Sequence, residues 1–176
     1  VNNLKEACFG SQYFTAHGIE PNMDKCFEYA CQAPIDNNIA ETLVILIPNT
    51  TEYAGITYMY GDGSAVAVCP MSADAYPYDF RGIIQHEAGG HGFAKLGDEY
   101  IYTHYWIDKC GCDNPHDGDL RAGKALGWYR NLSLTGDVNL VDWSHLIFHP
   151  TYANIVDVYE GGYFHTRGIF RSEATS

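Results

Sequence analysis

The glycine-rich segment from Gln85 to Tyr100 constrains the fold more than any other part of this sequence. It reads QHEAGGHGFAKLGDEY and places two histidines, three acids and four glycines in sixteen residues. The residues ahead of it predict a helix, but glycine in a helix interior costs about 1 kcal/mol relative to alanine. The pair Gly89-Gly90 therefore needs a structural reason, either a widened helical turn or the close approach of another chain segment.

The spacing of the two histidines indicates which reason applies. In the zinc motif HExxH, histidines four positions apart share one helix face, and the glutamate between them is the general base. His86 and His91 are five positions apart, which on a regular α-helix would separate them by about 140°. A π-bulge hydrogen-bonds i to i+5 and brings these positions back into line, and such bulges occur mostly at functional sites. We therefore expect a bulge at Gly89-Gly90.

One carboxylate lies between the two histidines and two more follow them. Glu87 directly follows His86, where a general base would stand, and Gly97 ends the predicted helix just before Asp98 and Glu99. Two histidines and a carboxylate, with a fourth position open to water, form an ordinary catalytic zinc set. The simpler alternative is a buried glycine-rich helix whose histidines only form hydrogen bonds.

Hydrophobic patterning predicts a helix and three strands ahead of the histidine-bearing helix. The first helix spans Met23–Gln32. Glu41–Ile47 is a strand whose continuous apolar core predicts burial on both faces, and 56–69 reads as a β-hairpin. The histidine-bearing helix is expected to begin after an N-cap at Asp79 and to run to about Leu96.

Beyond this helix the pattern weakens. Residues 108–120 read as a polar loop, and Leu140–Phe148 and Ile155–Tyr159 fit short helices or strands equally well. The predicted class is α+β, with a small mixed sheet packed on the histidine-bearing helix and a long irregular C-terminal half. We expect residues 1–176 to form a single domain. Because the sequence starts without an initiator Met, we interpret it as an excised piece of a longer chain, with room for further domains.

The charge balance excludes several classes of partner. With 10 Lys and Arg against 22 Asp and Glu, the formal net charge is −12, which argues against nucleic acid and against an anionic membrane surface. No apolar run is long enough for a transmembrane helix. Six cysteines without a CxxC pair disfavour a zinc ribbon and leave disulfides and buried thiols open; they are Cys8, Cys26, Cys31, Cys69, Cys110 and Cys112.

The stretch HEAGGHGFAKLGDEY resembles the IgA-peptidase family of zinc metallopeptidases, which is common in gut bacteria. The family's tail, Gly-x-x-x-Leu-x-Asp-Glu-Tyr, is matched from Gly92 to Tyr100. The similarity extends upstream over 43–70 and downstream to Tyr159-Glu160-Gly161-Gly162 and Arg171-Ser172-Glu173. It covers most of the chain, although the specific part is the fifteen-residue stretch itself.

The resemblance implies a metzincin-like fold and a bound Zn²⁺, with Glu87 as general base and His86, His91 and Asp98 as ligands. Metzincins place the third ligand six residues after the second histidine and a methionine turn beneath the zinc. Here the sixth residue is glycine, the acid is the seventh, and no Met follows Met71. Glu99 is therefore the next candidate for the third ligand, followed by a distant histidine; the two considered are His104 and His165.

The expected function is a zinc-dependent endopeptidase that acts on polypeptides and is secreted, periplasmic or at the bacterial cell surface. Tyr100 or Tyr102 would stabilise the oxyanion, and Glu99 or Glu160 would orient an imidazole. One alternative is a non-catalytic cell-surface module that binds glycan or protein with a degenerate HExxxH helix. Another is a zinc enzyme acting on a non-peptide amide.

Overall fold

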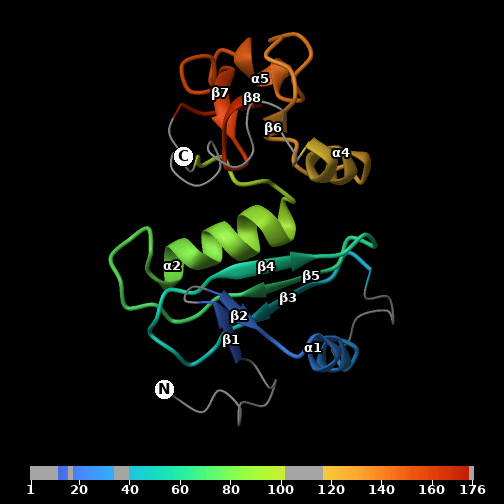
Figure 1. The fold of residues 1–176 in the computed structure, drawn as a ribbon, viewed down its shortest axis with the longest axis vertical. Coiled ribbons are helices and arrows are strands. Elements are labelled where there is room, and N and C mark those ends of the chain that lie inside the picture. The colour runs from blue at the N-terminus through green and yellow to red at the C-terminus, as the bar shows by residue number, and fades with distance from the viewer. Residues whose placement is uncertain (1–11, 16–17, 34–39, 102–116, 175–176) are drawn as a thin grey trace. The chain divides into compact units, whose positions relative to one another are not determined.

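The computed structural model describes residues 12–15, 18–33, 40–101 and 117–174, and every structural statement below concerns these. The chain divides into two compact units, Val1–Ala94 and Lys95–Ser176 (Figure 1). Both units contain helices and a small sheet, so the α+β class predicted from the sequence is confirmed. None of the helices in the described part of the chain is long and apolar enough to cross a membrane.

The first unit is organised around a three-stranded sheet with the order β3-β5-β4. The central strand β5 (Ala65–Val68) is buried at all four positions. It pairs in parallel with β3 (Leu43–Leu46) and antiparallel with β4 (Ile56–Met59), which confirms the predicted hairpin. Small residues along β5 suit the central position because layers pack closely on both of its faces.

The prediction that the apolar strand is buried on both faces is wrong. β3 pairs only with β5 among the described strands, so it lies at one edge of this sheet. Ile45 is 45% exposed and Ile47 is 50% exposed, whereas Leu46 is buried in the core. A continuous apolar run therefore marked an edge strand, and the short run of alanine and valine in β5 marked the buried one.

One face of the sheet is covered by the N-terminal elements. These are the antiparallel pair β1 (Gln12–Thr15) and β2 (Gly18–Glu20), and the helix α1 (Met23–Ala30). The helix begins where the sequence predicts and ends two residues earlier, with Asn22 Oδ1 accepting the Lys25 N–H at 3.0 Å as its N-cap. The core on this face includes buried side chains from β2, α1, the sheet and the loop before β4: Ile19, Cys26, Leu46, Ala54, Val66 and Val68.

The opposite face is covered by the histidine-bearing helix. Because side chains alternate along a strand, Ala67 and Cys69 point away from Val66 and Val68, and they pack with Ile83 and Ala88 of the helix. Figure 1 shows the resulting three layers, with the sheet between α1 and the histidine-bearing helix. The alanines of β5 leave room for the helix backbone to approach the sheet.

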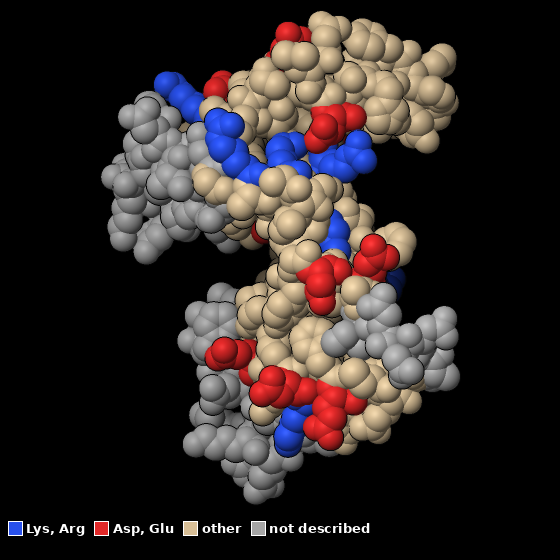
Figure 2. Space-filling view, turned by 90° about the vertical axis from the view of Figure 1, so that its right-hand side faces the viewer, with Lys and Arg blue, Asp and Glu red and all other residues tan. Residues whose placement is uncertain are grey.

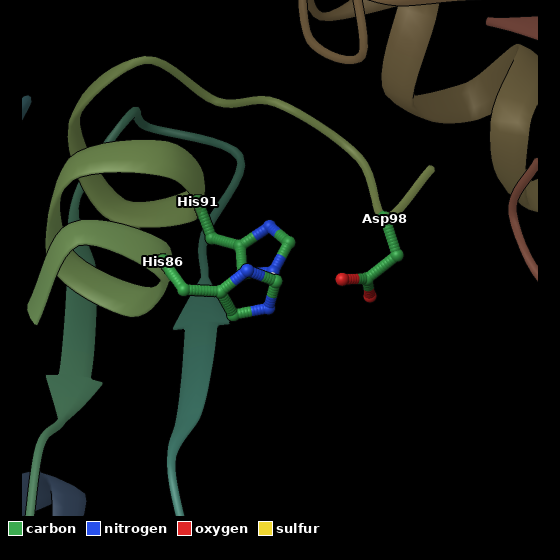
Figure 3. A group of neighbouring side chains, drawn as sticks. All are labelled: His86, His91 and Asp98. Carbon is green, nitrogen blue, oxygen red and sulfur yellow. The ribbon is translucent and has the colours of Figure 1, made fainter. Parts of the chain in front are cut away.

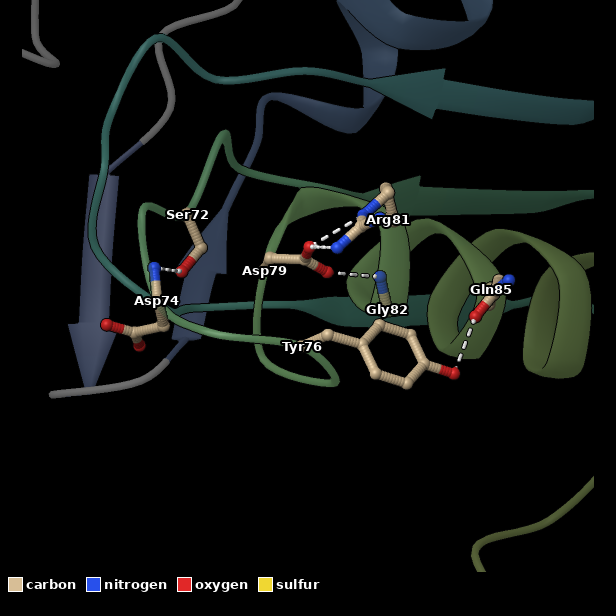
Figure 4. Close-up of polar contacts among 7 residues, drawn as sticks. All are labelled: Ser72, Asp74, Tyr76, Asp79, Arg81, Gly82 and Gln85. Carbon is tan, nitrogen blue, oxygen red and sulfur yellow. Dashed lines mark hydrogen bonds and ion pairs between the residues drawn. The ribbon is translucent and has the colours of Figure 1, made fainter.

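The start of this helix is fixed by side chains of the preceding loop (Figure 4). Asp79 Oδ1 accepts the Gly82 N–H at 3.0 Å, which confirms the predicted N-cap of α2 (Phe80–Ile83). Arg81 donates back to the Asp79 carboxylate at 2.7 Å. The Tyr76 hydroxyl reaches Gln85 Oε1 at 3.4 Å, which ties the loop to the following turn.

The second unit is more regular than the sequence predicts. Its antiparallel sheet has the order β6-β8-β7, formed by Leu132–Ser133, His165–Arg171 and Tyr159–Gly162 in that order. A helix α4 (Asp117–Ala125) occupies the end of the segment predicted as a polar loop, and α5 (Ser144–Ile147) is a single helical turn. The expectation of an irregular C-terminal half is therefore wrong for the described residues.

Each unit carries its own surface charge (Figure 2). The face of the first unit shown there carries mainly Asp and Glu among its charged groups. Lys and Arg side chains gather on the surface of the second unit, where Lys124 pairs with Asp142 at 2.8 Å. The acidic excess read from the composition is thus visible on this face of the first unit.

We predict that Gly92→Ala destabilises the protein. A Cβ added at this buried glycine would lie 2.5 Å from Leu43 Cδ1 and 3.3 Å from the Glu87 carbonyl oxygen. Overpacking of this kind costs about 1–3 kcal/mol, which urea unfolding would detect as a lower free energy of unfolding. Gly90→Ala is the matched control, because its Cβ would meet only Gln85 O at 3.6 Å. Equal stability of the two variants would contradict this packing.

Candidate metal centre

The histidine-bearing helix continues from α2 as a π-helix, η2 (Ile84–Phe93). The Ala94 N–H donates to the Gly89 carbonyl at 3.0 Å, five positions back. The widened turn predicted from the histidine spacing is confirmed, but the widening covers ten residues and not one turn. Added Cβ atoms at Gly89 and Gly90 would meet only the helix's own carbonyls, at 3.8 and 3.6 Å. Within the part of the chain that the structure describes, no neighbouring element therefore requires the glycine pair.

The π-helical winding brings His86 and His91 together on one side of the helix (Figure 3). Their Nε2 atoms are 3.1 Å apart, with ring centroids 4.6 Å apart and ring planes at 82°. Two nitrogens bound to one tetrahedral zinc, each at its usual bond length, are about 3.3 Å apart. The separation suits a shared metal ion, and it equally suits a hydrogen bond in which one Nε2 is protonated.

Asp98 completes a group of three metal-ligating side chains (Figure 3). One ring nitrogen from each histidine and one carboxylate oxygen of Asp98 all lie within 4.8 Å of one another. This is the set predicted from the sequence. Glu99 does not belong to it, since its carboxylate accepts hydrogen bonds from Asn131 at 2.9 Å and Ser172 at 3.1 Å.

Burial raises the pKa of the Glu99 carboxyl, and the bonds from Asn131 and Ser172 oppose that rise. Its carboxylate is thus a partly buried group that is held by hydrogen bonds. The distant histidines are not in the group either: His165 is only 5% exposed in β8, and His104 lies outside the described residues.

Glu87 points to the sheet side of the helix and is only 6% exposed. Thr57 Oγ1 lies 2.8 Å from Glu87 Oε2 and 2.9 Å from the Glu87 carbonyl oxygen, so its hydroxyl is placed to donate to either. A Cβ at Gly55 would lie 2.9 Å from Glu87 Oε1, and any side chain there would press on the carboxylate. The beginning of β4 therefore fixes the orientation of this glutamate.

Sequence reasoning missed Thr57 and Gly55 as partners of Glu87. Both lie about thirty residues before it, and nothing in the local sequence distinguishes Thr57 from other strand threonines. The only available signal was that 56–60 reads as a strand preceding the histidine-bearing helix. That signal places the strand near the helix without selecting the side chain that faces it.

The chain leaves the helix differently from the prediction. The helix ends at Phe93 and not near Leu96, and Lys95 adopts a left-handed backbone with φ of 55°. Gly97 does not end the helix; it is buried, and a Cβ there would lie 2.5 Å from Leu132 Cδ1. Close packing in the second unit therefore explains this glycine.

Two further predicted site residues have structural partners. Tyr100 packs edge-to-face against Phe164 with ring centroids 5.1 Å apart. Glu160, on β7, accepts the Gly168 N–H at 3.2 Å. The expected roles of these residues at an oxyanion or an imidazole stay predictions, and Tyr102 lies outside the described residues.

The described cysteines Cys26, Cys31 and Cys69 are free thiols, while the other three lie outside the described residues. Cys69 is fully buried against the histidine-bearing helix. Burial, with a smaller contribution from the charge of Glu87, raises the pKa of the Cys69 thiol to about 12. Cys69 is thus a protonated core side chain and not a member of the metal-ligating group.

No family model matches the chain, and no curated protein matches it. The resemblance to the IgA peptidases therefore rests on the motif residues alone.

We predict that Thr57→Val lowers the free energy of unfolding by about 1–3 kcal/mol, because it leaves buried oxygens of Glu87 without this donor. Thr57→Ser keeps the hydroxyl and is the matched control. Chemical unfolding of the two variants at neutral pH measures the difference. A loss in Thr57→Ser as large as in Thr57→Val would show that the methyl group, and not the hydrogen bond, matters at this position.

We predict that Cys69 resists alkylation in the native protein. With a pKa of about 12, its thiolate fraction at pH 8 is about one part in ten thousand, and burial also blocks access. Iodoacetamide at pH 8, followed by peptide mass mapping, should modify the exposed Cys31 and reach Cys69 only after unfolding in urea. Modification of both at the same rate in the native protein would contradict the burial of Cys69.

Proposed function

We propose that the chain is the catalytic part of a zinc-dependent endopeptidase, metzincin-like and related to the IgA peptidases that its motif resembles. One observation carries the proposal: the π-helix places His86 and His91 with their Nε2 atoms 3.1 Å apart, in one group with the Asp98 carboxylate. Nitrogen and carboxylate ligands of this kind, three in number, are typical of catalytic zinc sites.

His86, His91 and Asp98 would hold the ion in this proposal. Zinc so held supplies a Lewis acid for the scissile carbonyl and lowers the pKa of water at the open position to about 7. The ligand set is chemically suitable, since borderline-soft zinc accepts imidazole together with a carboxylate.

Glu87 acts as the general base in the proposed reaction. Thr57 engages Oε2 of its carboxylate, which orients the group. The carboxylate accepts a proton from the attacking water as the water oxygen bonds to the carbonyl carbon. It then delivers that proton to the amine nitrogen as the C–N bond breaks. One water is consumed and two peptide fragments are released.

A second candidate is the non-catalytic module that binds glycan or protein. The low exposure of Glu87, 6%, favours it, because a general base must meet water. A degenerate site, however, would not need three convergent ligands. The proposal also places the protein outside the cytoplasm, secreted, periplasmic or at the cell surface, where it acts on polypeptides.

We predict that Glu87→Gln retains zinc but loses at least about a hundredfold in peptide hydrolysis, the scale of general-base catalysis. Glutamine keeps the size of the side chain and an oxygen for Thr57, so the fold is preserved. The measurements are metal analysis after loading at neutral pH and hydrolysis of a mixed peptide library.

Two further variants complete this experiment. His91→Ala should lose both zinc and activity, and Glu52→Ala, an exposed acid of the same unit, should change neither. If the wild-type protein takes up no stoichiometric zinc, the proposed function is wrong. If it binds zinc and hydrolyses no peptide, the binding module or an amide hydrolase replaces the endopeptidase.

A further inference from the structure

We propose that Asn131 is a positioning residue for metal binding: its side chain holds the backbone of Gly97 and the side chain of Glu99, the two neighbours of Asp98, and so sets where the Asp98 carboxylate lies. The inference rests on the proposed function, because it assumes that Asp98 is a metal ligand. Asn131 itself contacts neither substrate nor metal in this proposal. Every interaction that carries it lies within the second unit.

The amide of Asn131 uses both of its ends. Its Oδ1 accepts the Gly97 N–H at 2.9 Å, and its Nδ2 donates to the Gly97 carbonyl at 2.8 Å. The same Nδ2 donates to Glu99 Oε1 at 2.9 Å. Asn131 therefore engages the residue before Asp98 and the residue after it.

The segment around Asn131 makes further contacts with the same stretch of chain. The Tyr129 N–H donates to the Lys95 carbonyl at 2.7 Å. Tyr129 and Leu132 both pack so close to Gly97 that a Cβ there would lie 3.1 and 2.5 Å from their side chains. Residues 129–132 thus pack along residues 95–99, and Asn131 supplies the side-chain hydrogen bonds between the two segments.

Backbone bonds from a second segment hold the other side. The Asp98 carbonyl accepts the Tyr163 N–H at 2.8 Å, and the Tyr100 carbonyl accepts the Phe164 N–H at 3.1 Å. Tyr163 and Phe164 adopt positive φ angles of 47° and 70°, so this turn keeps a sparsely populated backbone while it makes these bonds. With its backbone held on both sides, Asp98 has little freedom left except in its own side chain.

The chemistry of the contacts requires an amide at position 131. Aspartate would keep the acceptor for the Gly97 N–H but would lose both donors. It would also place a carboxylate next to the Gly97 carbonyl and the Glu99 carboxylate, where the interactions are repulsive. Asn131→Asp therefore removes the hydrogen bonds that Nδ2 donates to Gly97 and Glu99, with almost no change in side-chain size.

The test is the affinity for Zn²⁺ alone, measured by competition with a chromophoric chelator on the full chain. Partners that orient a metal ligand typically contribute 10–100-fold in metal affinity, so Asn131→Asp should weaken Zn²⁺ binding by about that factor. The visible spectrum of the Co²⁺-loaded protein should change as well, because it reports the geometry of the ligands. Circular dichroism of the metal-free variant checks its fold; if Asn131→Asp is unfolded, Asn131→Ser is measured in its place.

Two control variants separate this role from general effects. Asn139→Asp makes the same chemical change on an exposed turn of the same unit, where the Asn139 side chain donates to Asp137 Oδ1 at 3.1 Å. Ser172→Ala removes the other hydrogen bond to Glu99 but leaves the grip on Gly97. Both controls should bind Zn²⁺ within about threefold of the wild type. If Ser172→Ala loses as much Zn²⁺ affinity as Asn131→Asp, the hydrogen bonds between Asn131 and Gly97 are not the cause of the loss, and the proposal is overturned.

A double-mutant cycle links Asn131 to its target. In the Asp98→Asn background, Asn131→Asp should have little further effect on Zn²⁺ affinity, because the ligand it positions is already weakened. Additive losses would overturn the proposal. If wild-type protein binds Zn²⁺ and Asn131→Asp binds it equally well, the inference fails while the proposed function stands. If the wild type binds no Zn²⁺, the proposed function itself fails and takes this inference with it.

Discussion

The i→i+5 hydrogen bonding of η2 is the constraint on which the candidate centre depends. An ordinary α-helix would turn His86 and His91 about 140° apart, whereas the wider winding leaves their Nε2 atoms 3.1 Å apart. The same winding directs Glu87, between them in the chain, to the sheet side, where Thr57 engages its carboxylate. The π-helical winding therefore places His86 and His91 together at the candidate centre and directs Glu87 to the sheet.

The sheet allows this helix to lie close. The central strand β5 presents Ala67 to the helix, and Gly92 comes within contact of Leu43 on β3, where a Cβ would not fit. Gly55 in turn leaves room for the Glu87 carboxylate. Small residues on both sides of the interface thus fix the depth of the helix and the position of its buried acid. The apolar bulk of the core lies on the other face of the sheet, against α1.

The features predicted correctly from the sequence are those that depend on residues close together in the chain. The Asp79 cap, the hairpin of β4 and β5, and the widened helix all follow from residues within a few positions of one another. The failures concern long-range partners. The burial of β3 depended on its place at an edge of the sheet, and Gly97, predicted to end the helix, instead packs against Leu132. In the sheet of the second unit, Leu132 pairs with Arg171, which lies far along the chain, and no pattern in the sequence near either residue predicts this pairing.

The π-helical winding supports the part of the proposal in which the two histidines do more than hydrogen-bond to each other. A histidine pair could form a hydrogen bond at i, i+4 on an ordinary α-helix, without π-helical turns or a glycine pair in the helix interior. Among the described residues, no neighbouring element comes close to the space that Gly89 and Gly90 leave. The proposed metal centre is consistent with this winding, since one ligand atom each from His86, His91 and the Asp98 carboxylate lie within 4.8 Å of one another. The backbone that carries this carboxylate is held by separate contacts, which a surface acid would not require.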